Sequence, residues 1–387
     1  MPDLMTSLEL CSLCPKLCSH VCPVYRTSGK ETWSPQNKMA SLLGLETKAE
    51  HATEAEAMPL YACTACGACS EACLHKVEPA FHLLRGRAAA EKHDLGHQKL
   101  SGLPERAFEA AEKMIGALRK EMDVAARIAR PGQVGILPTC QFFSCDGQSD
   151  DGNSGEAVVA SARRVLGVAD SLRHRRVDVP ECGVLAVGSV GYPLYAAGHH
   201  ESFRLHAEKL AAELSGYSMI VADCSLCTYV LRVVYPMYGV PLKPPVLHVS
   251  EWILPYASAI PVKRPFKKVW YHAPCHLERR LNIDAPRRLL ARLADEVADF
   301  GPRNVNWSPE GPGGGDGHTG ETPCCGAAGL LPVTNPLLAS GMAAEAWAEA
   351  DVDDDSPTVS GCPTCAAHLC KSGHPTHDLL WALSLAF

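Results

Sequence analysis

The sequence predicts an α+β multidomain protein, in which a helical, cysteine-rich N-terminal part precedes two α/β units. Three observations lead to this fold class. The chain has 387 residues, enough for two or three domains. Its cysteines are bunched into four regions separated by ordinary helical and strand-like sequence. From residue 133 onward, short apolar strands alternate with helices, which favours parallel sheets.

Composition narrows the possible partners and the cysteine chemistry. A net charge of −7 and the lack of a dense Lys/Arg run argue against nucleic acid. The N-terminus "MPDLMTSLELC" has no signal-peptide pattern, and no window approaches a membrane-spanning length, so we expect a cytoplasmic protein. Nineteen cysteines in a reducing compartment predict metal sites instead of disulfides.

The first segment, residues 1–100, contains two cysteine runs joined by an amphipathic stretch. Residues 101–131 follow as a connecting helix, because "LPERAFEAAEKMIGALRKEMDVAARIAR" has apolar positions at helical spacing. The first α/β unit is expected over residues 132–258, with strands at "VGILPTC", "MIVADC" and "PVLHVSEWI" and helices near 154–166 and 200–215.

A Pro-rich joint, "PYASAIPVKRPFK", leads into the second α/β unit over residues 259–387. This unit begins at "KKVWYHAPC", continues through "PRRLLARLADEVADF" and "NPLLASGMAAEAWAEA", and closes with "PTVSGC" and an apolar helix. The Gly-rich stretch "SPEGPGGGDGHTGETP" lacks the Lys-Ser/Thr ending of a phosphate loop, so it predicts a loop without nucleotide binding. In both units a cysteine ends the first strand and a C-x-x-C ends a later strand, which indicates an internal repeat.

The two N-terminal cysteine runs predict a pair of cubane [4Fe-4S] clusters. In such runs three thiolates hold one cluster and the fourth cysteine of the other run completes it. The crossed assignment places Cys11, Cys14, Cys18 and Cys73 at the first cubane, and Cys63, Cys66, Cys69 and Cys22 at the second. Two zinc sites are the alternative, but they need ligand pairs separated by a longer arm. The long spacer resembles the helical ferredoxin domain of succinate dehydrogenase iron–sulfur subunits, although Pro follows Cys22 and does not follow Cys73.

Five further cysteines occur in the motifs "HAPCH", "PCCGAAG" and "GCPTC": Cys275, Cys324, Cys325, Cys362 and Cys365. These motifs, in this order after paired ferredoxin runs, resemble the CCG-domain iron–sulfur proteins. That family includes the B and D subunits of heterodisulfide reductase, the C subunit of anaerobic glycerol-3-phosphate dehydrogenase, and glycolate and lactate oxidase iron–sulfur subunits. The resemblance implies a helical ferredoxin-like domain followed by two α/β CCG domains.

The resemblance also implies that these five cysteines, hereafter the pentad, hold a noncubane [4Fe-4S] cluster. Independently of it, the cysteines fall at strand ends and turns, where α/β sheets gather ligands. Gly326 lets the backbone approach a cluster without a Cβ. A zinc ion bound by four of these cysteines and a site without metal are the alternatives.

The first repeat is degraded. Cys140, Cys224 and Cys227 match the outer positions of the motif, but the adjacent pair aligns with Ser189 and Val190. A competing alignment uses Glu181 and Cys182. The spacing to Cys224 favours the first alignment. A metal bound by Cys140, Cys182, Cys224 and Cys227 is the possible site in this repeat, and four buried unliganded cysteines are the alternative.

Four residues near these motifs have weaker signals. His272 and His276 bracket Cys275, where they could contact a cluster sulfur or deliver a proton, although well-bonded structural histidines are the simpler expectation. Cys145 and Cys370 match no motif and are expected to be structural.

Together these observations predict an iron–sulfur electron-transfer subunit of an oxidoreductase complex, without substrate chemistry of its own. The resemblance implies a flavoprotein dehydrogenase or electron-transfer flavoprotein as donor, and a membrane quinone-reducing or b-type cytochrome subunit as acceptor. Membrane association would then come only through that partner. The alternative is a heterodisulfide reductase-like catalytic subunit acting at the noncubane cluster, which the missing first pentad disfavours. A zinc-stabilised interaction scaffold is a third hypothesis, which leaves the eight N-terminal cysteines unexplained.

Overall fold

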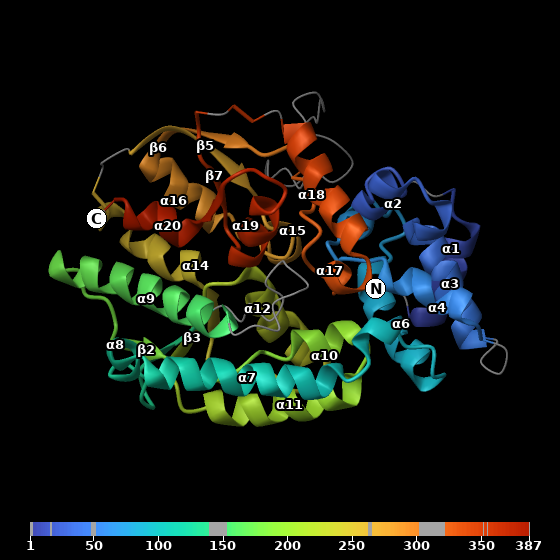
Figure 1. Cartoon of the computed structure of the whole chain (residues 1–387), viewed down its shortest axis with the longest axis horizontal. Helices are drawn as coiled ribbons and strands as arrows, with labels where there is room; N and C mark the ends of the chain where they lie inside the picture. The colour runs from blue at the N-terminus through green and yellow to red at the C-terminus, as the bar shows by residue number, and fades with distance from the viewer. Residues whose placement is uncertain are drawn as a thin grey trace.

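The computed structural model describes residues 3–15, 18–47, 52–138, 153–261, 265–301, 322–350, 352–353 and 355–386. A helical N-terminal part lies at one end of the molecule, and the two sheets with their helices form the rest (Figure 1). The mixed helix and sheet class expected from the sequence is confirmed.

The N-terminal part is built from short helices and turns. They are α1 (Leu4–Leu13), α2 (Pro23–Ser28), η1 (Glu31–Trp33), α3 (Pro35–Thr47), α4 (Glu54–Tyr61), α5 (Ala68–Glu71), α6 (Pro79–Lys92) and η3 (Gln98–Leu100). Local signals set several of these starts. Asp3 accepts a hydrogen bond from the Thr6 N–H at the start of α1, and Thr53 with Glu56 forms a capping box at α4.

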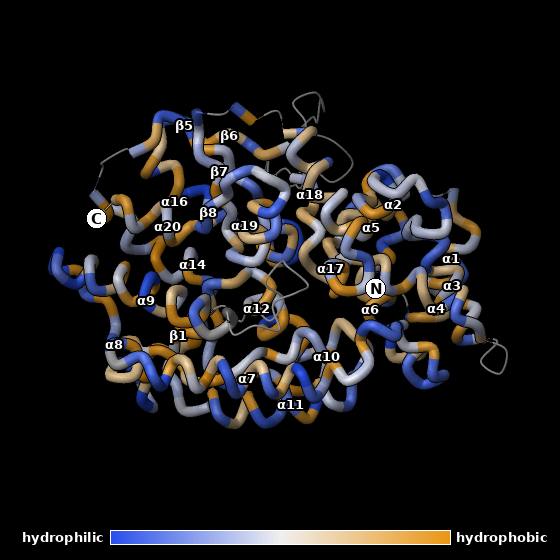
Figure 2. The backbone as a smooth tube through the Cα atoms, viewed as in Figure 1, coloured by the Kyte–Doolittle hydropathy of each residue, from blue (hydrophilic) through white to orange (hydrophobic). Residues whose placement is uncertain are grey.

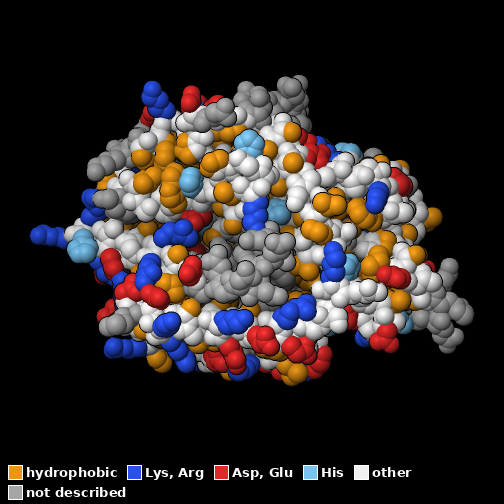
Figure 3. Space-filling model, viewed as in Figure 1, with side chains coloured by type: hydrophobic (Ala, Val, Ile, Leu, Met, Phe, Trp, Pro, Cys, Tyr) orange, Lys and Arg blue, Asp and Glu red, His pale blue; other side chains and the backbone are white. Residues whose placement is uncertain are grey.

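The connecting helix is shorter than the sequence pattern suggested. Helix α7 (Leu103–Lys120) ends at Lys120, and a short α8 (Met122–Ala125) follows. Beyond α8, the Ala129 N–H donates to the Val184 carbonyl, so this segment runs alongside a strand instead of continuing as a helix. Charged side chains gather over α7 and over α11 (His200–Leu214), along the lower edge of the face in Figure 3.

The first sheet is parallel, with strand order β2-β1-β3-β4. Its strands are β1 (Val134–Leu137), β2 (Cys182–Val184), β3 (Met219–Ala222) and β4 (Val246–His248). Its helical segments are α9 (Asn153–His174), α10 (Tyr192–Ala197), α11 (His200–Leu214), α12 (Ser225–Tyr229), the π-helical η4 (Val230–Val234), α13 (Tyr235–Met237), α14 (Val249–Ile253) and η5 (Leu254–Ala259).

The second sheet repeats this topology as β6-β5-β7-β8, again parallel throughout. Its strands are β5 (Phe266–His272), β6 (Ala294–Asp299), β7 (Thr358–Ser360) and β8 (Thr376–Asp378). Its helices are α15 (Glu278–Leu281), α16 (Ala285–Leu293), α17 (Leu331–Thr334), α18 (Pro336–Ala350), α19 (Pro363–Cys370) and α20 (Leu379–Ser384). The matching strand orders are the structural counterpart of the internal repeat seen in the sequence.

The two sheets share one hydrophobic core. Val221 on β3, Trp252 on α14, Tyr271 on β5, Leu290 on α16 and Leu380 on α20 belong to the same buried cluster. Hydrophobic residues accordingly mark much of α16 and α20 in Figure 2. A second cluster joins the N-terminal helices to α10 and α11, through residues such as Leu42 and Phe203. Burial of both clusters fixes the cysteine-bearing loops relative to one another.

Within the described ranges, none of the helices combines the length and the apolar character needed to cross a membrane.

Candidate metal centres

The first cysteine cavity lies at the N-terminal end of the molecule. Its lining includes the four cysteines expected at the first cubane, Cys11, Cys14, Cys18 and Cys73. Cys14 ends α1, where its N–H donates to the Cys11 carbonyl. All four thiols are partly exposed. Burial nevertheless raises the pKa of Cys11 to about 12 and that of Cys18 to about 11, so metal binding must displace their protons.

The second cavity is lined by the other four, Cys22, Cys63, Cys66 and Cys69. Each of these cysteines is less than one-tenth exposed. Cys22 caps α2, while Cys63 and Cys66 lie in the loop between α4 and α5. Cys69 lines both cavities, so the two sites adjoin. The structure therefore brings the eight cysteines together in the two groups that the crossed assignment predicts.

The third cavity contains the pentad in its lining, at the carboxyl ends of the second sheet's strands. Cys275 follows β5, Cys362 follows β7 and caps α19, and Cys324 with Cys325 precedes α17. All five thiols are buried. The third cavity is similar in size to the second.

Two glycines shape the loop that carries the adjacent cysteines. Gly326 has a φ of +88°, and a Cβ there would lie 2.8 Å from the Ala339 carbonyl oxygen. Gly329 has a φ of +70°, and its Cβ would lie 2.8 Å from the Thr64 Cα and closer still to the Cys63 carbonyl oxygen. Glycine at position 326 therefore lets the Cys324–Cys325 loop pack against α18, and glycine at position 329 lets it pack against the loop of the second cavity.

Thiol contacts connect the second and third cavities. The Cys324 Sγ lies 3.5 Å from the Thr64 Oγ1, and Cys324 also hydrogen-bonds with Cys66. This bond, together with burial, raises the pKa of Cys66 well above the usual thiol value. A hydrogen bond with Cys275 lowers the pKa of Cys324 in turn. The three cysteine cavities thus form one continuous series.

Arg279 lies between the second and third cavities. Its guanidinium donates to Glu71, at 2.9 Å, and to the Cys66 carbonyl, at 3.5 Å. Burial acts to lower the pKa of Arg279, but the neighbouring Cys66 and Cys275 thiols outweigh burial and raise it. A permanent positive charge therefore faces both groups of thiols, which favours the negatively charged thiolate forms.

The two histidines beside Cys275 differ in their bonding. The His272 Nδ1 lies 3.1 Å from the Ser360 Oγ and its Nε2 lies 3.2 Å from the Pro323 carbonyl oxygen, as expected of a structural histidine. The His276 Nδ1 lies 3.4 Å from the Cys275 Sγ, whereas its buried Nε2 has no hydrogen-bond partner among the described residues. Burial lowers the pKa of His276 to about 3, so the imidazole is neutral near pH 7.

The first sheet lacks the adjacent thiols of the second. Ser189 and Val190 precede Gly191, which has a φ of +80° and leads into α10, just as Gly326 follows the Cys324–Cys325 pair. Both residues are buried. This matching backbone supports the alignment with Ser189 and Val190 over the one that uses Glu181 and Cys182.

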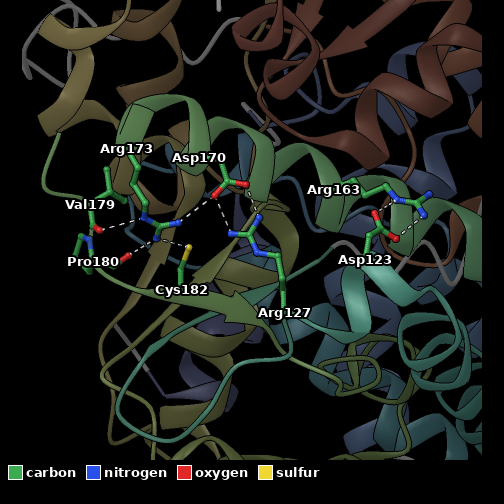
Figure 4. Close-up of polar contacts among 8 residues, drawn as sticks. All are labelled: Asp123, Arg127, Arg163, Asp170, Arg173, Val179, Pro180 and Cys182. Atoms are coloured by element: carbon green, nitrogen blue, oxygen red, sulfur yellow. Dashed lines mark hydrogen bonds and ion pairs between the residues drawn. The ribbon is translucent and has the colours of Figure 1, made fainter. Parts of the chain in front are cut away.

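Cys182 does not join the other cysteines of the first repeat. It pairs in register with Val134 at the start of β1, whereas Cys224 follows the end of β3, so the two lie at opposite ends of the sheet. The Cys182 Sγ instead accepts a hydrogen bond from Arg173, at 3.2 Å (Figure 4). Cys140 and Cys145 lie outside the described residues. The expected set of four cysteines is therefore wrong in its inclusion of Cys182.

Cys224 lies against the pentad. Its Sγ is 3.9 Å from the Cys362 Sγ, and this contact is the largest factor holding the pKa of Cys362 well below the usual thiol value. The sequence did not predict this contact or the position of Arg279, because both depend on how the two sheets and the N-terminal helices pack. The run "CHLERR" places Arg279 near Cys275 but says nothing of the second cavity. Cys370, which matches no motif, is exposed.

Comparison with known proteins gives matches at both ends of the chain. Residues 7–77 match the model of a 4Fe-4S dicluster domain, and residues 317–370 match that of the cysteine-rich CCG domain. The chain is 26% identical over 361 residues to the B subunit of fumarate reductase (CoM/CoB) from Methanothermobacter marburgensis. That match covers 91% of this chain and 65% of the relative, so the chain spans just under two thirds of the relative's length.

Two further relatives are the D subunits of dihydromethanophenazine:CoB–CoM heterodisulfide reductase from two Methanosarcina species. The one from Methanosarcina mazei is 24% identical and the one from Methanosarcina barkeri 23% identical. Each match covers 94% of this chain and 89% of the relative. The chain therefore contains a match to a 4Fe-4S dicluster domain near its N-terminus and a match to a cysteine-rich CCG domain near its C-terminus.

Proposed function

We propose that this chain is the electron-transferring iron–sulfur subunit of a reductase-type oxidoreductase complex. The observation that carries the proposal is the continuous series of three thiol-lined cavities, joined at Cys69 and at the Cys66–Cys324 contact. When bound, iron–sulfur clusters supply one-electron transfer. Contact between successive sites is what a relay requires.

The donor sets fit such clusters. The first two cavities together offer eight thiols, with Cys69 lining both, and the third offers five, with no disulfide among the described cysteines. Soft thiolate ligands select iron–sulfur clusters, zinc or copper(I), and a five-thiol set exceeds the four ligands of a structural zinc site. We therefore assign Cys11, Cys14, Cys18 and Cys73 to one cubane, Cys22, Cys63, Cys66 and Cys69 to a second, and the pentad to a noncubane cluster.

The proposed domains follow from these sites. Residues 1–100 form the helical ferredoxin-like domain, and 101–131 connect it to the sheets. Residues 132–258 form a degenerate first CCG domain, and 259–387 an intact second one. The similar topologies of the two sheets support this division, and so do the equivalent glycines Gly191 and Gly326.

The first cavity is the proposed contact site for an electron-transfer partner. Its four thiols are partly exposed, whereas those of the other two cavities are buried. Leu13 and Leu74, which neighbour these cysteines in the sequence, are 88% and 67% exposed. A partly exposed site with exposed apolar neighbours suits docking of a redox partner. We propose a flavoprotein there, and a quinone-linked membrane protein or b-type cytochrome as the further partner.

A second candidate function is reduction of a disulfide substrate at the pentad. The unpartnered His276 Nε2 favours it, because His276 lines the third cavity and a buried polar atom without a partner can hydrogen-bond to a substrate. Two relatives are named as heterodisulfide reductase subunits. The replacement of the first adjacent thiol pair by Ser189 and Val190 counts against it.

A reduction experiment separates these candidates. The anaerobically purified chain is reduced with photoreduced flavin, and its reoxidation is followed by visible absorbance with a quinone analogue or a small disulfide. A relay is reoxidised by the quinone analogue and leaves the disulfide unchanged. Catalytic disulfide cleavage would contradict the relay. Cys324→Ala is expected to lose one cluster signal, whereas the exposed control Cys370→Ala keeps all of them.

A further inference from the structure

The first sheet places a cysteine, Cys224, against Cys362 of the pentad. Cys224 follows β3 and is the N-cap residue of α12, and Cys362 follows β7 and is the N-cap residue of α19. β3 and β7 are the third strands along the chain in sheets of the same topology. The two cysteines therefore occupy equivalent positions in the two repeats, and their sheets face each other at this point.

The contact between these two cysteines is close and buried. Their Sγ atoms are 3.9 Å apart, and the Cys224 Sγ lies 3.8 Å from the Thr364 Oγ1. Cys224 is 3% exposed and Cys362 is 2% exposed. The two residues that follow Cys224, Ser225 and Leu226 of α12, line the third cavity together with the pentad. One wall of the cavity therefore comes from α12.

The sulfur separation fits two ligands of one metal ion. Thiolates bind at about 2.3 Å in tetrahedral sites, which places two of them roughly 3.8 Å apart. A disulfide would need about 2.05 Å. A weak S–H hydrogen bond between the two thiols is the remaining explanation of the distance.

His276 provides an independent indication of a bound group. The residue is 4% exposed and lines the same cavity, and its Nε2 has no hydrogen-bond partner among the described residues. Its ring packs against Tyr229 of α12, with ring centroids 5.1 Å apart. Buried polar atoms rarely lack a hydrogen-bond partner, so this unpartnered nitrogen indicates a bound group in the cavity.

We propose that Cys224 is a sixth thiolate of the metal centre in this cavity and shares one iron with Cys362. The proposal rests on the proposed function, because it requires an iron–sulfur group at the pentad. Cys224 gives up its thiol proton on binding, as thiol ligands of metals do. The degenerate first repeat would then have lost its own metal site, but it would supply one ligand, Cys224, to the metal site of the second repeat.

The test compares Cys224→Ala and Cys224→Ser with wild type and with Cys182→Ala. Cys182 is a buried cysteine of the same sheet that lies at its opposite end, so it controls for loss of a buried thiol. Each protein is purified anaerobically as the full chain. Iron and acid-labile sulfide are measured, and EPR spectra are recorded after reduction and after oxidation.

We expect Cys224→Ala to lose or shift the EPR signal of the third centre and to lose up to about four of about twelve irons, with both cubane signals intact. Cys224→Ser is expected to give a shifted signal, because a hydroxyl is a poor iron ligand. Cys182→Ala should match wild type.

A wild-type spectrum and iron content in either Cys224 variant would overturn the proposal. For Cys224→Ser that result would assign Cys224 a hydrogen-bonding role alone. Loss of the cubane signals as well in Cys224→Ala would show that this variant has misfolded. The Cys224→Ser variant alone would then decide whether Cys224 is a ligand. A wild-type chain with cubane signals but no third centre would instead overturn the proposed function, whatever the variants show.

Discussion

Arg87 is a fully buried arginine that joins three parts of the chain. Its guanidinium donates to the carbonyls of Leu60 and Cys63 in the N-terminal part, of Ala196 in α10, and of Gly329 in the loop after the adjacent cysteines. It also lies over the Tyr61 ring, 5.0 Å from the centroid. One side chain therefore satisfies carbonyls around both the second and the third cavity.

Replacing Arg87 should destabilise the protein strongly. Arg87→Met leaves buried carbonyls without donors, and we expect the free energy of unfolding to fall by about 3 kcal/mol or more. Arg106 is the matched control, because its guanidinium also donates to backbone carbonyls but in an exposed setting. Arg106→Met should cost less than about 1 kcal/mol. Equal losses in anaerobic denaturant titrations would contradict the role of Arg87.

Arg279 should set the reduction potential of the two groups beside it. Arg279→Gln removes a buried positive charge next to Cys66 and Cys275, so the oxidised, less negative state gains stability. We expect the potentials of the second and third centres to fall by about 40 to 130 mV, from Coulomb energies of about 1 to 3 kcal/mol at protein dielectric. EPR-monitored redox titration measures this.

Arg279→Lys keeps the charge and is the control for that experiment. Its potentials should stay near those of wild type, although the fork-shaped contacts to Glu71 and the Cys66 carbonyl are lost. A similar drop in both variants would show that geometry, and not charge, sets the potentials.

His200 should make stability depend on pH. Burial, with a contribution from Arg85, lowers its pKa to about 4, while its Nδ1 lies 2.8 Å from the Tyr238 hydroxyl. The unfolded chain binds the proton near pH 6.5, so stability falls as pH drops from about 6.5 towards 4. Between pH 7 and pH 5 the loss from this residue should be about 2 kcal/mol. His200→Gln should lose about that much less over the same range in denaturant titrations, and an identical loss in both proteins would refute the assignment.

At the scale of elements, the sequence predicted the strands that carry chemistry better than the others. β1, β3, β5 and β7 are apolar and lead into cysteine motifs, and each was expected. β6 was not separated from α16, because this edge strand carries exposed Asp295 and Glu296 and lacks an apolar pattern. The connecting helix ends early because Ala129 pairs with Val184 in a contact that no local pattern encodes.

The candidate sites show the same contrast between features set by local sequence and features set by packing between distant elements. Cysteine spacing predicted the thiols of the first two cavities, since ligand spacing is a local property of the chain, whereas the resemblance to CCG-domain proteins supplied the pentad. The contacts of Cys224 with Cys362 and of Arg279 with Cys66 depend on packing between elements far apart in sequence. The prediction grouped Cys182 with Cys224 because its sequence neighbourhood resembles the motif. Its position at the start of β2 instead places it at the opposite end of the sheet.

The loop after the adjacent cysteines should be sensitive to a single methyl group. Gly329→Ala adds a Cβ against Cys63 and Thr64, whereas Gly239→Ala adds one at a similar φ, +74°, with nothing within 4 Å. Gly239→Ala should cost about 1 to 2 kcal/mol from backbone strain alone. Gly329→Ala should cost at least about 2 kcal/mol more in thermal or denaturant unfolding. Equal costs would show that the two loops are not in tight contact.

At the scale of the whole molecule, three thiol-lined cavities run from a partly exposed end into the interior between the sheets. Cys69 joins the first two, the Cys66–Cys324 contact joins the second to the third, and Cys224 of the first sheet contacts Cys362 of the third. Shared hydrophobic clusters hold the N-terminal helices against both sheets, so the series is part of the rigid core.

The most direct test of this account is a count of iron, acid-labile sulfide and zinc in the anaerobically purified full chain. Two cubanes and one noncubane [4Fe-4S] cluster predict about twelve irons and about twelve sulfides per chain, with no zinc. About eight irons with one zinc would contradict the three-centre relay, because it would place a metal without redox chemistry at the pentad.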